Sequence, residues 1–174
     1  ISMRLLSEEL RSGTIETLMT SPLSDAQVIV GKWLGALLFL LVLFLPLVAQ
    51  MALLEVYASP DYGPLLTGLL GLVLVGGLYL AVGTLMSAVN ENQIIVFMLT
   101  MFVTGFLTIG LYFLAPLTIW PDRVQQTLFY INVDRRFEDF GKGVIDTRNL
   151  VFFVSGIMAF LFIAVKVLES KRWR

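Results

Sequence analysis

The chain has 174 residues, of which 57% are hydrophobic and only 14% are charged, whereas about 25% are charged in an average soluble protein. Its 12 basic and 13 acidic residues leave no excess positive charge of the kind that holds nucleic acid. Cysteine and histidine are absent, which excludes disulfides, thiolate and imidazole catalysis, and the commonest ligands of transition metals. These properties predict an integral membrane protein whose partners include membrane lipid and exclude nucleic acid.

The first polar segment covers residues 1–32 and precedes the first apolar run. The sequence begins at Ile1 without the basic region and cleavable apolar stretch of a signal peptide, so we interpret it as a fragment with a cut N-terminus. The segment is predicted to form a helix, a break, a short second helix and a turn at Ser21-Pro22. Residues 24–27 then form a capping-box pattern, which predicts the start of the next helix.

Four long runs without Asp, Glu, Lys or Arg follow this segment. A charge at the centre of a bilayer costs about 2.5–3.5 kcal/mol on insertion scales, so such runs are typical of membrane spans. The first would rise about 33 Å as a helix, enough for a hydrocarbon core about 30 Å thick. Only Glu91 separates the second run from the third, which predicts a tight hairpin, and Lys166 is expected to extend its amine to the interface. The predicted fold class is all-α, a polytopic transmembrane helical bundle with spans at residues 33–54, 64–89, 93–118 and 149–167.

A second polar segment, residues 122–148, separates the last two spans. Two sets of apolar residues recur there at helical spacing: Val124, Leu128 and Ile131, then Phe137, Phe140 and Val144. This pattern predicts two short amphipathic helices, re-entrant or on the membrane surface.

Basic residues set the expected orientation, because lysine and arginine are enriched in cytoplasmic loops. They are concentrated near both ends of the chain, as Arg4, Arg11, Lys32, Lys166, Lys171, Arg172 and Arg174. The loop at residues 55–63 has none, although the segment at 122–148 has several. We therefore expect both termini to be cytoplasmic, with residues 55–63 and 122–148 outside.

The stretch from Met3 to Ser24, MRLLSEELRSGTIETLMTSPLS, and the following Gly31-Lys32 carry a family likeness. They resemble the cytoplasmic loop of the type-two ABC exporter permeases. Residues 137–148, FEDFGKGVIDTR, resemble the outer segment before the last helix in the gliding-motility and sodium- or copper-associated branch of that family. Family members usually have six spans with this loop between the second and third. The resemblance therefore implies that the chain starts after the second transmembrane helix, and that residues 1–174 are one permease domain.

The resemblance implies a permease subunit of an ABC transporter that works as an exporter in the bacterial inner membrane. Its implied partners are a cytoplasmic ABC ATPase subunit and a second permease, in a homodimer or a heterodimer. The chain lacks the phosphate-binding pattern GxxxxGK[ST], so ATP and Mg²⁺ are expected on the partner and no cofactor in this chain. The alternative function is a non-transporting membrane scaffold or a channel component.

The resemblance also implies a coupling helix in the first segment, an element that rests in a groove of the nucleotide-binding subunit. Ile15, Leu18 and Met19 give this helix an apolar face, and Glu16 lies in its first turn, where the helix dipole favours a carboxylate. By pattern alone, a helix lying on the membrane surface is an equally good interpretation. The expected ATPase-coupling interface comprises Glu9, Arg11, Gly13, Thr14, Ile15, Glu16, Leu18, Met19, Ser21 and Pro22.

The predicted spans offer few candidates for chemistry or for a substrate path. An intramembrane hydrolase needs paired acids or an activated nucleophile, and tyrosine is the only ionisable residue type in the four apolar runs, so we expect no enzyme. Candidate path residues are Gln50, Thr100, Thr104 and Thr108. For the threonines helix packing is the stronger interpretation, because threonine in apolar helices commonly donates to the carbonyl four residues earlier.

Overall fold

The computed structural model describes residues 24–57, 60–117 and 119–172, and within these ranges the regular elements are all helices. The expected coupling helix and its interface residues, Glu9 to Pro22, lie outside the described residues. Four helical stretches are long and apolar enough to cross a membrane: Asp25–Glu55, Tyr62–Val89, Gln93–Leu114 and Thr147–Lys171. The predicted all-α bundle with four spans is confirmed.

The first span consists of two helices, α3 (Asp25–Leu43) and α4 (Leu45–Tyr57). Helix α3 begins at the predicted capping box, where the Ser24 hydroxyl accepts from the Gln27 backbone N–H and the Gln27 side chain accepts from the Ser24 backbone N–H. The span therefore starts eight residues before the expected position 33. It is interrupted at Phe44, because Pro46 has no N–H to donate into the helical ladder and its ring displaces the preceding turn.

The second and third spans form the predicted hairpin around Glu91. Helix α5 (Tyr62–Val89) is capped by Asp61, whose carboxylate accepts from the Gly63 N–H at 3.0 Å. The third span comprises α6 (Gln93–Gly105), the π-helix η2 (Phe106–Gly110) and α7 (Leu111–Leu114). It ends four residues before the expected 118, since the chain turns at Ala115 and Pro116.

The segment before the last span forms two helices, α8 (Asp122–Ile131) and α9 (Val133–Gly141). The second apolar stripe is shorter than expected, because Val144 lies beyond α9 and is exposed. Gly143 has a φ of 85°, a conformation that suits glycine and that ends the helix. The last helix, α10 (Thr147–Arg172), begins before the expected 149 and continues past 167, and the Asp146 carboxylate accepts from the Arg148 N–H at 2.8 Å.

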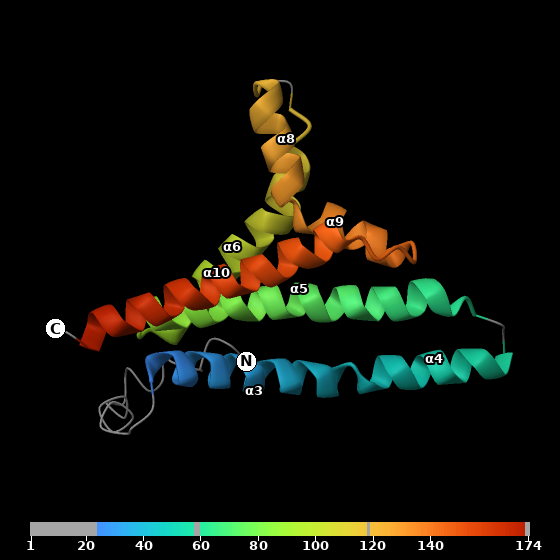
Figure 1. Cartoon of the computed structure of the whole chain (residues 1–174), viewed down its shortest axis with the longest axis horizontal. Helices are drawn as coiled ribbons and strands as arrows, with labels where there is room; N and C mark the ends of the chain where they lie inside the picture. The colour runs from blue at the N-terminus through green and yellow to red at the C-terminus, as the bar shows by residue number, and fades with distance from the viewer. Residues whose placement is uncertain (1–23, 58–59, 118, 173–174) are drawn as a thin grey trace.

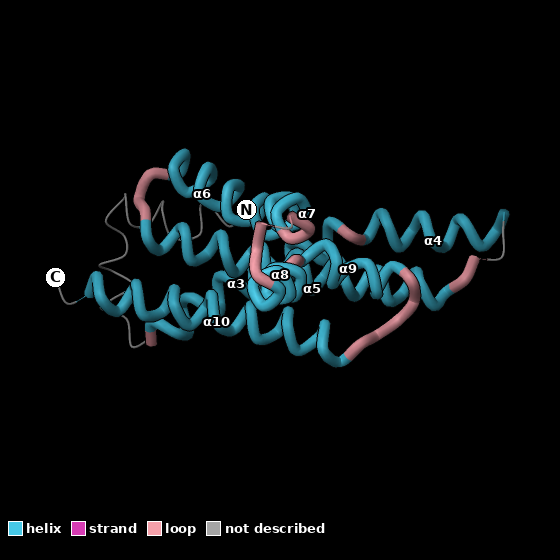
Figure 2. Tube along the Cα trace, turned by 90° about the horizontal axis from the view of Figure 1, so that it is seen from above, coloured by secondary structure: helices cyan, strands magenta, loops and turns pink. Residues whose placement is uncertain are grey.

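Helix α5 is the centre of the bundle and contacts α3, α6, α9 and α10 (Figures 1 and 2). Helix α9 lies alongside the first half of α5, where the Thr67 hydroxyl donates to the Phe140 carbonyl at 2.7 Å. Gly71, one turn further along α5, leaves the space that the Phe137 and Phe140 side chains occupy. Helices α7 and α8 project sideways from the bundle (Figure 1).

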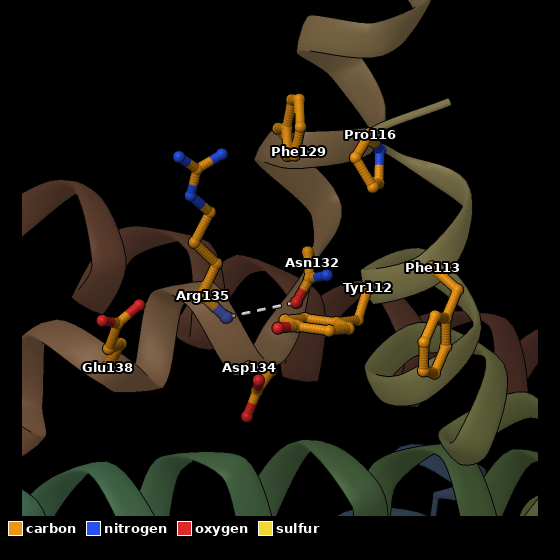
Figure 3. Close-up of a pocket in the computed structure, with 8 residues that line it drawn as sticks. All are labelled: Tyr112, Phe113, Pro116, Phe129, Asn132, Asp134, Arg135 and Glu138. Carbon is orange, nitrogen blue, oxygen red and sulfur yellow. Dashed lines mark hydrogen bonds between the residues drawn. The ribbon is translucent and has the colours of Figure 1, made fainter. Parts of the chain in front are cut away.

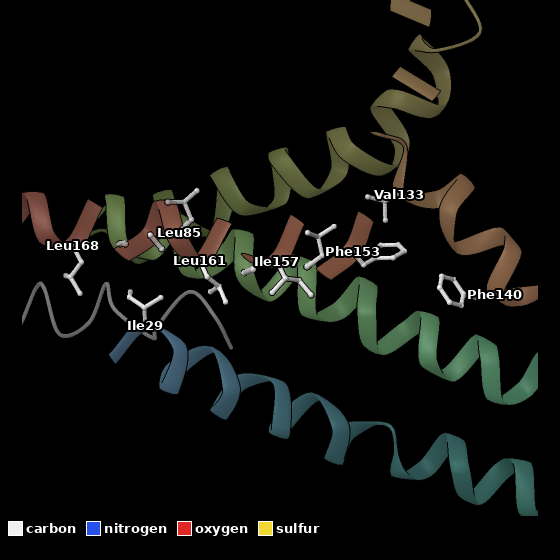
Figure 4. Close-up of a cluster of buried hydrophobic side chains, with 12 residues drawn as sticks. Ile29, Leu85, Val133, Phe140, Phe153, Ile157, Leu161 and Leu168 are labelled. Carbon is white, nitrogen blue, oxygen red and sulfur yellow. The ribbon is translucent and has the colours of Figure 1, made fainter. Parts of the chain in front are cut away.

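The core lies where α3, α5, α9 and α10 converge (Figure 4). Ile29, Val133, Phe140 and Phe153 are almost completely buried in it. The Trp33 indole N–H donates to the Gly77 carbonyl at 3.0 Å, so α3 and α5 are joined by a directional bond as well as by packing. In a membrane, close packing and such interhelical bonds take the place of the hydrophobic effect in holding helices together.

Candidate functional site

A cavity of about 320 Å³ opens where α7, α8 and α9 meet, and we call it the corner cavity (Figure 3). It is lined by Tyr112, Phe113, Pro116, Phe129, Asn132, Asp134, Arg135 and Glu138. A second cavity of about 220 Å³, the hydroxyl cavity, reaches from Asp134 to Thr108 and Ile109. The two cavities share the walls formed by Tyr112, Phe113 and Asp134, so Asp134 faces both.

Asn132 sets the angle between α8 and α9 and is only 2% exposed. Its Oδ1 accepts from the Arg135 backbone N–H at 3.1 Å and so caps α9, as Asn commonly does at a helix start. Its Nδ2, which lines the corner cavity, donates to no acceptor among the described residues. The Arg135 guanidinium stacks over the Phe129 ring, 4.6 Å from its centroid. The corner thus offers an amide donor beside a cation held against an aromatic face.

Asp134 lies in the first turn of α9, where it is exposed and lines both cavities. Its side chain points toward α5 in Figure 3. The Tyr79 and Thr108 hydroxyls lie 2.8 Å apart. Because the Thr108 proton is directed to the Thr104 carbonyl, Tyr79 is the donor in this pair. Among the described residues Asp134 forms no ion pair, so its charge is available to the cavities.

The structure separates the predicted path residues into different environments. Thr100 and Thr104 donate to the carbonyls four residues earlier, both at 2.7 Å, which is the back-bonding that the packing interpretation predicted. Thr108 differs from the other three because it lines the hydroxyl cavity, in addition to its hydrogen bond with Tyr79. Gln50 is exposed on α4 and does not line the corner cavity. A role in substrate passage remains a prediction for all four.

Sequence reasoning missed a network that ties α9 to α10. The Arg136 guanidinium donates to Asn149 Oδ1, and Asn149 Nδ2 donates to Asp139 Oδ2, both at 2.7 Å. Arg136 also donates to the Tyr130 carbonyl and lies 4.0 Å from the centroid of the Tyr130 ring. Asn149 is 1% exposed, so the network is anchored in the interior. The available signal was the spacing of Arg136 and Asp139, which places them on one face of a helix.

Glu138, which also lines the corner cavity, is already paired. Lys142 lies 2.7 Å from it, one turn along α9, and both side chains are more than 60% exposed. The Glu138 carboxylate raises the pKa of Lys142 above its usual value through this hydrogen bond. An exposed pair of this kind contributes little to stability. Its consequence for the site is that Glu138 is partly neutralised and Asp134 carries the free negative charge.

Comparison with known families gives one decisive match. A family model described as ABC-2 family transporter protein matches residues 1–165, which includes the first polar segment and most of the last span. The chain belongs to this ABC-2 family. No curated protein and no solved structure matches the chain.

Membership in the ABC-2 family makes the chain a membrane component of a transporter. ABC-2 permeases normally work with an ATPase subunit, which accords with a chain built of membrane spans. The family assignment supports the resemblance found in residues 3–24 at the level of the family. It does not test the gliding-motility and sodium- or copper-associated branch.

Proposed function

We propose that the chain is the permease subunit of an ABC exporter in the bacterial inner membrane, in the branch associated with gliding motility and with sodium or copper. A separate cytoplasmic ATPase binds ATP and Mg²⁺, and a second permease completes the path. The observation that carries the proposal is the ABC-2 match across residues 1–165, which joins the first polar segment to the four spans.

The helix that follows the first segment supports a coupling role for that segment. Helix α3 begins at Asp25, immediately after the residues proposed to contact the ATPase, and it enters the core directly. Ile29 is fully buried against α5 and α10, and Trp33 bonds to the α5 backbone. A displacement of the coupling helix would therefore act on the centre of the bundle through α3, which contacts both α5 and α10.

The proposed orientation places the start of α3 and the C-terminal ends of α5 and α10 in the cytoplasm. These ends gather at one extremity of the bundle, together with the C-terminus (Figure 1). Lys171 there donates to the Val89 carbonyl at 3.2 Å, so a basic side chain caps the end of α5. Basic residues at this end, including Lys32, agree with the enrichment of lysine and arginine on the cytoplasmic side.

The test of the proposal is capture of the ATPase by the full-length permease and by its Leu18→Asp variant. Burying a leucine against a partner contributes about 1.5–3 kcal/mol, and aspartate would also place an unpaired charge in the groove. We expect Leu18→Asp to insert normally, to lose the ATPase and to abolish transport, whereas the control Leu18→Met retains both. If the variant keeps the ATPase with unchanged coupled turnover, the coupling assignment fails and a scaffold or channel becomes the better interpretation.

A further inference from the structure

An apolar groove runs along the third span and leads to the two cavities. It has a volume of about 590 Å³ and is lined in part by Phe97, Met101, Phe102, Phe106 and Ile109. Ile109 also lines the hydroxyl cavity, so the groove lies next to that cavity. The groove side chains are mostly exposed on the face of a membrane span, which makes the groove accessible from the lipid.

Along the third span, an apolar surface is followed by a polar one. From Gln93 to Tyr112 the span rises about 28 Å at about 1.5 Å per residue, close to the thickness of a hydrocarbon core. The groove occupies about 20 Å of this length, from Phe97 to Gly110, and the cavities open toward the end of the span at Leu114. An occupant with a long apolar part and a polar end would match this arrangement.

The polar end of such an occupant must pair both with a carboxylate and with hydrogen-bond donors. Asp134 supplies a carboxylate without an ion pair in the described structure, and the Tyr112 and Phe113 rings beside it can stabilise a cation through their faces. The Asn132 Nδ2 and the Arg135 guanidinium, on the other side of the corner cavity, can only donate hydrogen bonds. The site therefore presents an acceptor for an ammonium beside donors for an anionic oxygen.

We propose that this corner binds a phospholipid with a primary-amine headgroup. The ammonium pairs with Asp134, the phosphate accepts from Asn132 and Arg135, and an acyl chain lies in the groove. A lipid is favoured over a soluble amine because the groove opens on the membrane face of the span. This site requires only that the chain is embedded in a membrane, so it does not depend on the ATPase partner or on the direction of transport.

Two variants separate the headgroup contact from the chain contact. Asp134→Asn removes the charge and keeps the shape, and Asp122→Asn removes the same charge from α8 at a position outside the described cavities. Gly105 lines the groove, and a Cβ added there meets nothing within 4 Å. Gly105→Leu is thus compatible with the fold while it fills part of the groove.

The experiment is lipid titration of the full-length permease, purified with its ATPase, followed by native mass spectrometry. The probes are phosphatidylethanolamine, phosphatidylglycerol and a soluble decylammonium salt. We expect phosphatidylethanolamine to bind more tightly than phosphatidylglycerol, and Asp134→Asn to weaken its binding about tenfold, the size typical for a hydrogen bond to a charged group. Gly105→Leu should weaken both lipids alike, and Asp122→Asn should change neither.

Three outcomes would overturn the proposal. Equal loss in Asp134→Asn and Asp122→Asn would show a general effect of charge. A preference for phosphatidylglycerol would show that the donors and not Asp134 select the headgroup. Binding of decylammonium without binding of phosphatidylethanolamine would replace the lipid by a soluble amphipathic amine. A separate result concerns the proposed function. If the wild-type permease captures no ATPase but still binds the lipid, the proposed function is contradicted and this lipid site is not.

Discussion

Replacement of Gly71 by alanine tests whether α9 is docked on α5 as the structure shows. A Cβ at this position would lie 2.9 Å from Phe140 Cβ and 3.0 Å from two ring atoms of Phe137. Phe140 Cβ is attached directly to the backbone and cannot rotate away. Relief of the contact therefore requires α9 to move from α5, which would also strain the bond from Thr67 to the Phe140 carbonyl.

The magnitude follows from comparison with Gly68→Ala, one turn earlier on the same helix. A Cβ at Gly68 meets nothing within 4 Å, so this control carries the helix-propensity gain of alanine, up to about 1 kcal/mol, without the clash. The same gain applies to Gly71→Ala and cancels in the difference between the two variants. The remaining overpacking should make Gly71→Ala less stable than Gly68→Ala by about 1–3 kcal/mol.

The assay is equilibrium unfolding of both full-length variants in mixed micelles, driven by sodium dodecyl sulfate and followed by circular dichroism. Hydrogen exchange of residues 133–141 under native conditions locates the effect, since undocking of α9 should raise exchange there before the spans unfold. Equal free energies of unfolding for the two variants, with unchanged exchange in α9, would refute the docking of Phe140 over Gly71.

Two further predictions address the network and the topology. Asn149→Leu should destabilise the α9–α10 contact by about 1–3 kcal/mol, because Arg136 and Asp139 lose their shared partner. Proteolysis of residues 122–148 in detergent should then be faster, and an unchanged rate of cleavage would argue against the network. In the cysteine-free chain, single cysteines at Asp61 and Gly141 should react with an impermeant reagent in intact cells, and one at Ser170 should not, whereas labelling at Ser170 alone would invert the orientation.

The spans could be predicted from the sequence because the physical rule behind them is local. A charge-free run of sufficient length is a span whatever it packs against, so the four spans follow from composition alone. Their ends depended on other signals. The capping box at Ser24 correctly placed the start of α3, whereas the end of the third span was missed, because the uncharged residues 115–117 continue the apolar run after the helix has stopped.

The candidate site could not be predicted in the same way, because it is formed by residues far apart in the chain. Tyr79 and Thr108 are brought together by packing of α5 against the third span, and a π-helix around Thr108 has no periodicity that the sequence displays. Asp134 appeared in the sequence only as one charge in a polar segment. Its place in the wall of both cavities depends on the turn at Asn132 between α8 and α9, which is a tertiary feature.

The same tertiary contacts explain how a polar segment can pack beside a membrane span. The basic residues of 122–148 were the one feature that disagreed with the expected outer location of this segment. In the folded chain Arg135 stacks on Phe129, and Arg136 bonds to Asn149 and to the Tyr130 carbonyl. These contacts replace part of the hydration of the two guanidinium groups. They therefore lower the free-energy cost of packing α9 against α5. Asp134 has no such contact within the described structure, so the wall of the cavities contains a carboxylate without an ion pair.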